Sequence, residues 1–101
     1  MPYIYHITLA ILNDRTSTAE LLLTKGASVE TTDNVMDTPL HDAVQGGHTS
    51  IVELLLTKGA PIDALNNKNQ TPLRLAIWKG HTDIIELLEN KATGLGTPEN
   101  I

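Results

Sequence analysis

The chain has 101 residues, a size that suits one domain and can bury roughly two thirds of the surface that the unfolded chain exposes. Seven Lys and Arg stand against twelve Asp and Glu, so the net charge of −5 disfavours nucleic acid as a partner. Cysteine is absent, which excludes disulfides and thiolate sites and favours an intracellular, cytoplasmic protein. No apolar run approaches the roughly 20 residues of a membrane span, so the protein is not expected to be embedded in a membrane.

Along the chain, the first recurring segment is residues 20–27, Glu-Leu-Leu-Leu-Thr-Lys-Gly-Ala, which returns letter for letter at residues 53–60, an offset of 33. Three further motifs keep the same offset: Thr-Pro-Leu at 38–40 and 71–73, Gly-His-Thr at 47–49 and 80–82, and an Ile-Val-Glu-Leu-Leu run at 51–55 and 84–88, where Ile replaces Val. A fixed period of this length is typical of repeat proteins whose units stack on one another.

The middle unit predicts two helices and a hairpin. Residues 39–45 form the first helix, with Thr38 as its N-cap and Pro39 in its first turn. Residues 49–58 form the second helix, which a Gly-Gly pair separates from the first. Residues 60–70 contain Pro and three Asn, and this composition favours an extended hairpin that leads to the next Thr-Pro-Leu. Because one helix pair cannot bury its apolar face alone, the units are expected to stack into a solenoid.

The middle unit closely resembles the ankyrin repeat, a 33-residue unit that carries Thr-Pro-Leu-His-x-Ala, here residues 38–43. The resemblance extends from about residue 2 to residue 93. It implies an all-α ankyrin-repeat solenoid of three helix-turn-helix units joined by hairpin loops. We expect the repeat domain over residues 1–95 and a C-terminal tail over 96–101, with repeats at about 3–35, 36–68 and 69–95.

The flanking units depart from the motif. Thr18 stands where the family usually has Ile, Glu89 replaces the third leucine of the run, and Arg74 replaces the motif histidine. Terminal repeats need polar outer faces, so Thr18 and Glu89 favour a complete small protein over an excised fragment. An alternative is that the first unit has an unfinished apolar end through which the protein dimerises. The residues that favour this alternative are Tyr3, Ile4, Tyr5 and Ile7.

The hairpin tips carry another departure. The family usually has glycine two residues before the motif threonine, at a position that favours a positive φ, whereas this chain has Met36 and Asn69. Asn tolerates that conformation and Met does not. We therefore expect the tip at residues 34–37 to be strained or differently folded.

Residues with catalytic or metal-binding chemistry are few. The histidines are His6, His41, His48 and His81. His48 and His81 share one repeat position, and His41 is the motif histidine, which is expected to form hydrogen bonds that fix the turn into its helix. The acidic cluster of Asp33, Asp37 and Asp42 is expected to be solvated. No known catalytic motif is present, so the sequence predicts a protein that is not an enzyme and needs no metal or cofactor.

The resemblance implies that a partner binds on the concave face, which the hairpin tips and the exposed side of each first helix form. The candidate partner-binding residues are Asn34, Val35, Asp37, Asp42, Gln45, Asn67, Lys68, Gln70, Leu75, Trp78 and Lys79. Trp78, the only tryptophan, is the first candidate for contact with a partner. Ordinary packing on the neighbouring helix is the alternative for this side chain.

Charge divides along this face, with acidic residues in the middle unit and Lys68, Arg74 and Lys79 in the last. A partner with a matching division would dock in one orientation. The leading hypothesis is a monomeric protein-interaction module whose partner is a protein of unknown identity. The alternatives are a structural protein that self-associates as a homodimer through its N-terminal repeat, and a small hydrolase or metal enzyme, for which the sequence offers no converging His and Asp.

Overall fold

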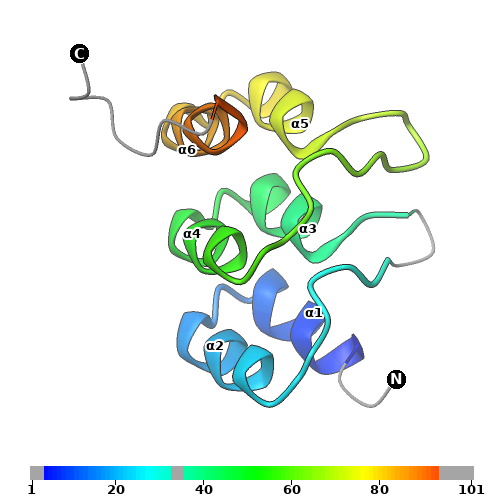
Figure 1. The fold of residues 1–101 in the computed structure, drawn as a ribbon, viewed down its shortest axis with the longest axis vertical. Helices are drawn as coiled ribbons and strands as arrows, with labels where there is room; N and C mark the ends of the chain where they lie inside the picture. The colour runs from blue at the N-terminus through cyan, green and yellow to red at the C-terminus, as the bar shows by residue number, and fades with distance from the viewer. Residues whose placement is uncertain (1–3, 33–35, 94–101) are drawn as a thin grey trace.

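The computed structural model describes residues 4–32 and 36–93, which form six helices in three antiparallel pairs (Figure 1). The pairs are stacked one on the next, and the long connections between pairs project to one side. The first helix of each pair lies on the side of these connections, and the second helix lies on the opposite side. In chain order the helices are α1 (Ile4–Leu12), α2 (Thr16–Thr24), α3 (Pro39–Gly46), α4 (Thr49–Thr57), α5 (Pro72–Lys79) and α6 (Thr82–Thr93). The predicted all-α architecture is confirmed over the described residues.

Local sequence explains where these helices begin and end. The hydroxyls of Thr38 and Thr71 each accept a hydrogen bond from the backbone N–H three residues later, at 3.3 and 3.1 Å, and each is followed by Pro. The predicted N-cap at Thr38 is therefore confirmed. Gly47 and Gly80 end α3 and α5 with φ of 72° and 74°, a conformation that glycine adopts without steric cost.

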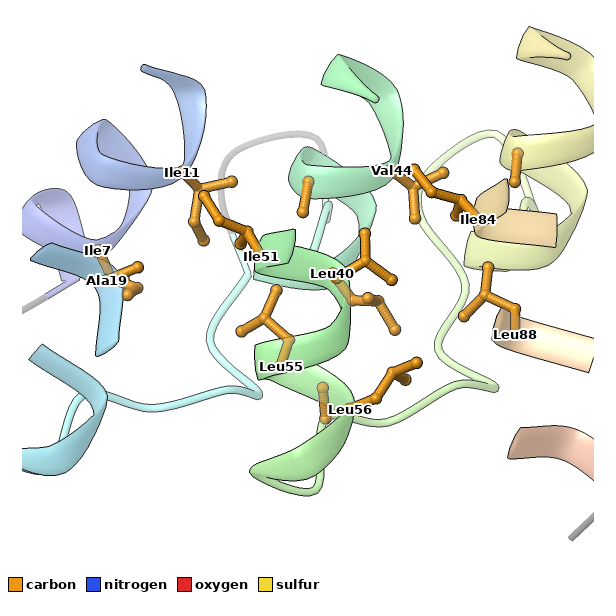
Figure 2. Close-up of a cluster of buried hydrophobic side chains, with 14 of the residues drawn as sticks. Ile7, Ile11, Ala19, Leu40, Val44, Ile51, Leu55, Leu56, Ile84 and Leu88 are labelled. Carbon is orange, nitrogen blue, oxygen red and sulfur yellow. The ribbon is translucent and has the colours of Figure 1, made fainter. Parts of the chain in front are cut away.

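The core is continuous through the stack and consists of aliphatic side chains (Figure 2). Ile11 of the first repeat points toward Ile51 of the second, and Val44 of the second points toward Ile84 of the third. Each of these four side chains is at most 1% exposed. The repeats are therefore held together by burial of aliphatic surface between neighbours, which contributes about 25 cal/mol for each Å² removed from water.

One residue of the first repeat does not fit the alternative of an unfinished apolar end. Ile7 is only 1% exposed because it packs in the core near Ala19 (Figure 2), so its assignment to an apolar end was wrong. Tyr3 and the side chains of Ile4 and Tyr5 lie outside the described part of the structure. Among the side chains that the structure describes in this repeat, the large apolar ones more than half exposed are Leu9, Leu12 and Leu21.

Both terminal repeats expose polar residues at positions that are apolar in the middle repeat. Thr18 is exposed, whereas Ile51 at the same position is fully buried. Glu89 is also exposed, whereas the equivalent Leu56 is 7% exposed. These two substitutions place polar instead of apolar side chains on the outer faces of the first and third repeats.

The hairpin position two residues before each motif threonine has a positive φ, the conformation that the usual glycine of the family favours there. Met36 has φ of 65° and Asn69 has φ of 59°. Residues 34 and 35 of the same tip lie outside the described residues. A third residue, Asp14, has φ of 55° at the position that Gly47 and Gly80 occupy in the later repeats.

Replacing Met36 with Gly is expected to raise the free energy of unfolding by about 0.5–1 kcal/mol. A residue with a Cβ pays about 1–2 kcal/mol to adopt the left-handed conformation, and glycine avoids this cost. Glycine also has more conformational freedom in the unfolded chain, which offsets part of the gain in stability. Urea unfolding followed by circular dichroism measures the change. Asn69→Gly is the matched control and should gain less, because Asn tolerates this conformation; an equal or larger gain in the control would contradict the explanation.

Candidate functional site

A hollow of about 430 Å³ lies on the side of the long connections, bounded by α3, α5 and the hairpin at residues 60–70. Its volume falls within the range of ligand-binding pockets, so several side chains of a partner could enter it. We call it the hairpin hollow. The residues that line it are Asp37, Gln45, Asn66, Asn67, Lys68, Gln70, Leu75, Trp78 and Lys79.

Eight of the eleven candidate residues line the hairpin hollow. Two of the others, Asn34 and Val35, lie outside the described residues. The third, Asp42, does not line the hollow and is only 8% exposed. The structure therefore brings most of the candidates into one concave surface, built from the hairpin at residues 60–70, the adjoining first helices and Asp37 of the preceding hairpin.

Asp42 requires a correction. It occupies the same repeat position as Leu75, which is 4% exposed, and Leu9, which is 58% exposed. The first helices of successive repeats pack on one another, α3 on α1 and α5 on α3, whereas no described helix precedes α1, the helix that carries Leu9. Asp42 is thus not accessible as a contact residue, and Leu75 contributes a buried apolar wall to the hairpin hollow.

Trp78 is the most exposed of the large apolar side chains in the described residues, with 76% of its surface accessible. Ordinary packing on the neighbouring helix therefore does not explain its presence. The Nζ atom of Lys79 lies 5.5 Å from the centre of the Trp78 ring, within the range of a cation–π contact. At an exposed position such a contact contributes about 0.5–1 kcal/mol, enough to favour one arrangement of the two side chains.

Asn66, which sequence reasoning missed, fixes the shape of the hairpin. Its Nδ2 donates to Asp37 Oδ1 at 3.0 Å and to Gln70 Oε1 at 3.1 Å. Its Oδ1 accepts from the backbone N–H groups of Lys68 and Gln70, both at 3.0 Å. All four hydrogen-bonding positions of the amide are thus used, which accounts for a polar side chain that is only 7% exposed. Asn is typical of turns, but the bond to Asp37 joins two successive hairpins and has no sequence signature.

A family model of ankyrin repeats, in three copies, matches residues 7–95. The chain belongs to the ankyrin-repeat family. A search of curated proteins found no match to it. Ankyrin repeats are generally protein–protein interaction modules and are typically not enzymes. No helix in the described residues is long and apolar enough to cross a membrane.

The motif histidine of the middle ankyrin repeat, His41, links that repeat to the next hairpin. The backbone N–H of Thr38 donates to Nδ1 at 3.1 Å, so the proton of the neutral ring is on Nε2, which donates to the carbonyl oxygen of Gln70 at 2.8 Å. His41 is fully buried. The expected structural role is confirmed, and it extends across the boundary between repeats. In the last ankyrin repeat Arg74 occupies this position and is exposed.

The other described histidines also contact neighbouring repeats. His48 Nδ1 lies 3.5 Å from Asp14 Oδ1 of the first ankyrin repeat. The ring of His81 packs so closely on Gly47 that a Cβ added there would lie 3.0 Å from its Cε1 atom. Within the described part of the chain, no group of three His, Cys, Asp or Glu side chains is placed to hold a metal ion.

Proposed function

We propose that this ankyrin-repeat protein binds a protein partner on the concave face centred on the hairpin hollow. The observation that carries the proposal is the 76% exposure of Trp78 at the rim of that hollow. An exposed tryptophan presents a large apolar area to water. When a partner buries such a residue, it contributes a large share of the binding energy. Neither a catalytic reaction nor a cofactor is part of the proposal. The cytoplasmic location stays a prediction.

The surroundings of Trp78 support an interaction site. Trp78 supplies the exposed apolar surface, the buried Leu75 lies behind it in the wall of the hollow, and amide and ammonium groups around it come from Gln45, Asn67 and Lys68. An apolar centre with a polar rim is the usual arrangement of a protein interface. With three repeats, the interface is expected to bury roughly 600–1,000 Å² per partner and to have micromolar affinity.

The test is retention of a protein from lysate of the source cell by the immobilised chain, compared between two double variants. Trp78→Ala with Lys79→Ala removes the proposed anchor. Lys25→Ala with Lys58→Ala is the control, because both lysines are exposed and neither lines the hairpin hollow. Both variants are first checked for unchanged circular dichroism.

We expect the wild type and the control to retain the same protein. The Trp78 and Lys79 variant should bind it at least about 30-fold more weakly, which corresponds to the loss of about 2 kcal/mol at an interface hot spot. Equal retention by all three proteins would place the site elsewhere and contradict the proposal.

Self-association through the first repeat is a second candidate function. A hollow of about 460 Å³ there is lined by Leu9, Ala10, Asn13, Arg15, Thr18 and Leu22. Leu9 is exposed, and the middle repeat has Asp42 at the same position. Leu9→Asp therefore removes the apolar side chain with a residue that this repeat position already accepts. A molar mass that rises with concentration in the wild type and stays monomeric in Leu9→Asp would support this function. A constant monomeric mass of the wild type would contradict it.

A further inference from the structure

We infer that the hairpin hollow accepts an acidic segment of the partner, with a carboxylate beside Lys68 and Lys79 and a neighbouring apolar side chain against Trp78. This inference rests on the proposed function and specifies the chemistry of the partner. It depends on three observations: the two cations, the state of the carboxylate in the hollow, and the position of the apolar surface.

The cations of the hollow have no partner of opposite charge among the residues that the structure describes. Lys68 lies at the hairpin tip and Lys79 at the end of α5, and both are exposed. Within residues 4–32 and 36–93, neither forms an ion pair with a carboxylate. Lys79 Nζ is instead held over the ring of Trp78, at 5.5 Å from its centre. Its ammonium group is therefore placed beside the apolar surface that a partner would cover.

The carboxylate that lines the hollow is engaged in a structural contact. Asp37 Oδ1 accepts the hydrogen bond from Asn66 Nδ2 that joins the two hairpins. Two lysines against this one aspartate give the hollow a positive balance, the opposite of the chain as a whole, whose net charge is −5. A local positive site on an acidic protein favours a short acidic segment and gives it one orientation.

Apolar surface lies beside these cations. Trp78 is exposed at the rim and Leu75 forms a buried wall. A partner side chain that covers Trp78 removes water from around the Lys79 ammonium, which strengthens its attraction to a carboxylate. The two contacts are therefore expected to reinforce each other when they come from adjacent residues of one segment. Nucleic acid has the acidic charge but would meet the negative charge of the remaining surface.

The experiment selects binders from a displayed library of random 12-residue peptides with the immobilised full-length chain. Recovered peptides are then titrated in solution while the emission of Trp78 is recorded. Because Trp78 is the only tryptophan, its emission reports occupancy of this site alone, provided that the peptides titrated contain none. The charge-reversal variant is Lys68→Glu with Lys79→Glu, and the control is Lys25→Glu with Lys58→Glu, which has the same net charge.

We expect the recovered peptides to be enriched in Asp or Glu next to an apolar residue and to change the emission of Trp78. The charge-reversal variant should bind them about 25-fold more weakly, about fivefold for each of the two cations, and the control should bind within about threefold of wild type. Raising the salt from 50 to 300 mM should weaken binding, because exposed charges are screened. Lys68→Gln with Lys79→Gln should give an intermediate loss.

Two other results have different meanings. Basic or neutral peptides that change the emission of Trp78 would overturn the inference while leaving the concave face as the binding site. Peptides that bind without changing that emission, and equally well to Trp78→Ala, would overturn both the inference and the proposed function. A library that yields no binder would also overturn the inference of a short acidic segment.

Discussion

Replacing Leu55 with Ala is expected to lower the free energy of unfolding by about 3–4 kcal/mol, the largest effect of a single substitution that we predict. Leu55 is fully buried in α4, at the centre of the stack (Figure 2). Its truncation removes apolar contacts and leaves a cavity, which costs about 2–5 kcal/mol in well-packed cores. Because small domains are stable by only about 5–15 kcal/mol, the variant should be close to the limit of stable folding.

Urea unfolding followed by circular dichroism measures this loss. Leu21→Ala is the matched control, because Leu21 belongs to the identical eight-residue segment of the first repeat but is 55% exposed. It should change the free energy of unfolding by less than about 1 kcal/mol, since little apolar surface is lost from the core. Similar losses in the two variants would contradict the assignment of the middle repeat as the centre of the core.

Replacing His41 with Ala is expected to lower the free energy of unfolding by about 2–3 kcal/mol. The substitution removes the ring that accepts from the backbone N–H of Thr38 and donates to the carbonyl oxygen of Gln70. A buried polar group that loses its partner costs about 1–3 kcal/mol, and the backbone N–H of Thr38 loses its acceptor here. The carbonyl oxygen of Gln70 loses one of two hydrogen bonds and keeps the one from the backbone N–H of Asn66, at 3.1 Å. Removal of the fully buried ring also leaves a cavity, which adds to the loss. The hairpin that borders the hollow also loses one of its attachments to the middle repeat.

Arg74→Ala is the control for this substitution, because Arg74 occupies the same repeat position and is exposed. Thermal unfolding should show a large decrease in Tm for His41→Ala and little change for Arg74→Ala. The emission of Trp78 in the native state, compared between each variant and the wild type, reports on changes in the hollow. A His41→Ala variant as stable as wild type would show that the link between the repeats contributes little.

The helices could be predicted from the sequence because their determinants are local. The predicted first helix of the middle unit, residues 39–45, corresponds to α3 (Pro39–Gly46), since the N-cap, Pro and glycine stop all lie within ten residues. The positive φ of Met36 followed from its place in the repeat in the same way. The positive φ of Asp14 has a signal of the same kind, because Gly47 and Gly80 stand at this position in the later repeats and Asp tolerates the left-handed conformation.

The details of the hollow could not be predicted, because they depend on contacts between repeats. Asn66 binds Asp37, 29 residues away, and no spacing rule within a repeat indicates such a bond. The burial of Asp42 depends on how closely α1 packs on α3. The exposure of Trp78 could not be predicted either. The 33-residue period indicates which face of the helix a residue lies on, but not how much of that face the neighbouring repeat covers.

The most direct test of the central claim, that a partner binds over the hairpin hollow, is photo-crosslinking from single positions. A photoreactive amino acid replaces Asn67 at the rim of the hollow in one variant and Glu53, which is exposed on α4 on the opposite side, in the other. Each variant is irradiated in lysate of the source cell, and covalent adducts are detected by mass spectrometry. A partner crosslinked from position 67 and not from position 53 is the predicted result; a partner crosslinked only from position 53 would contradict the claim.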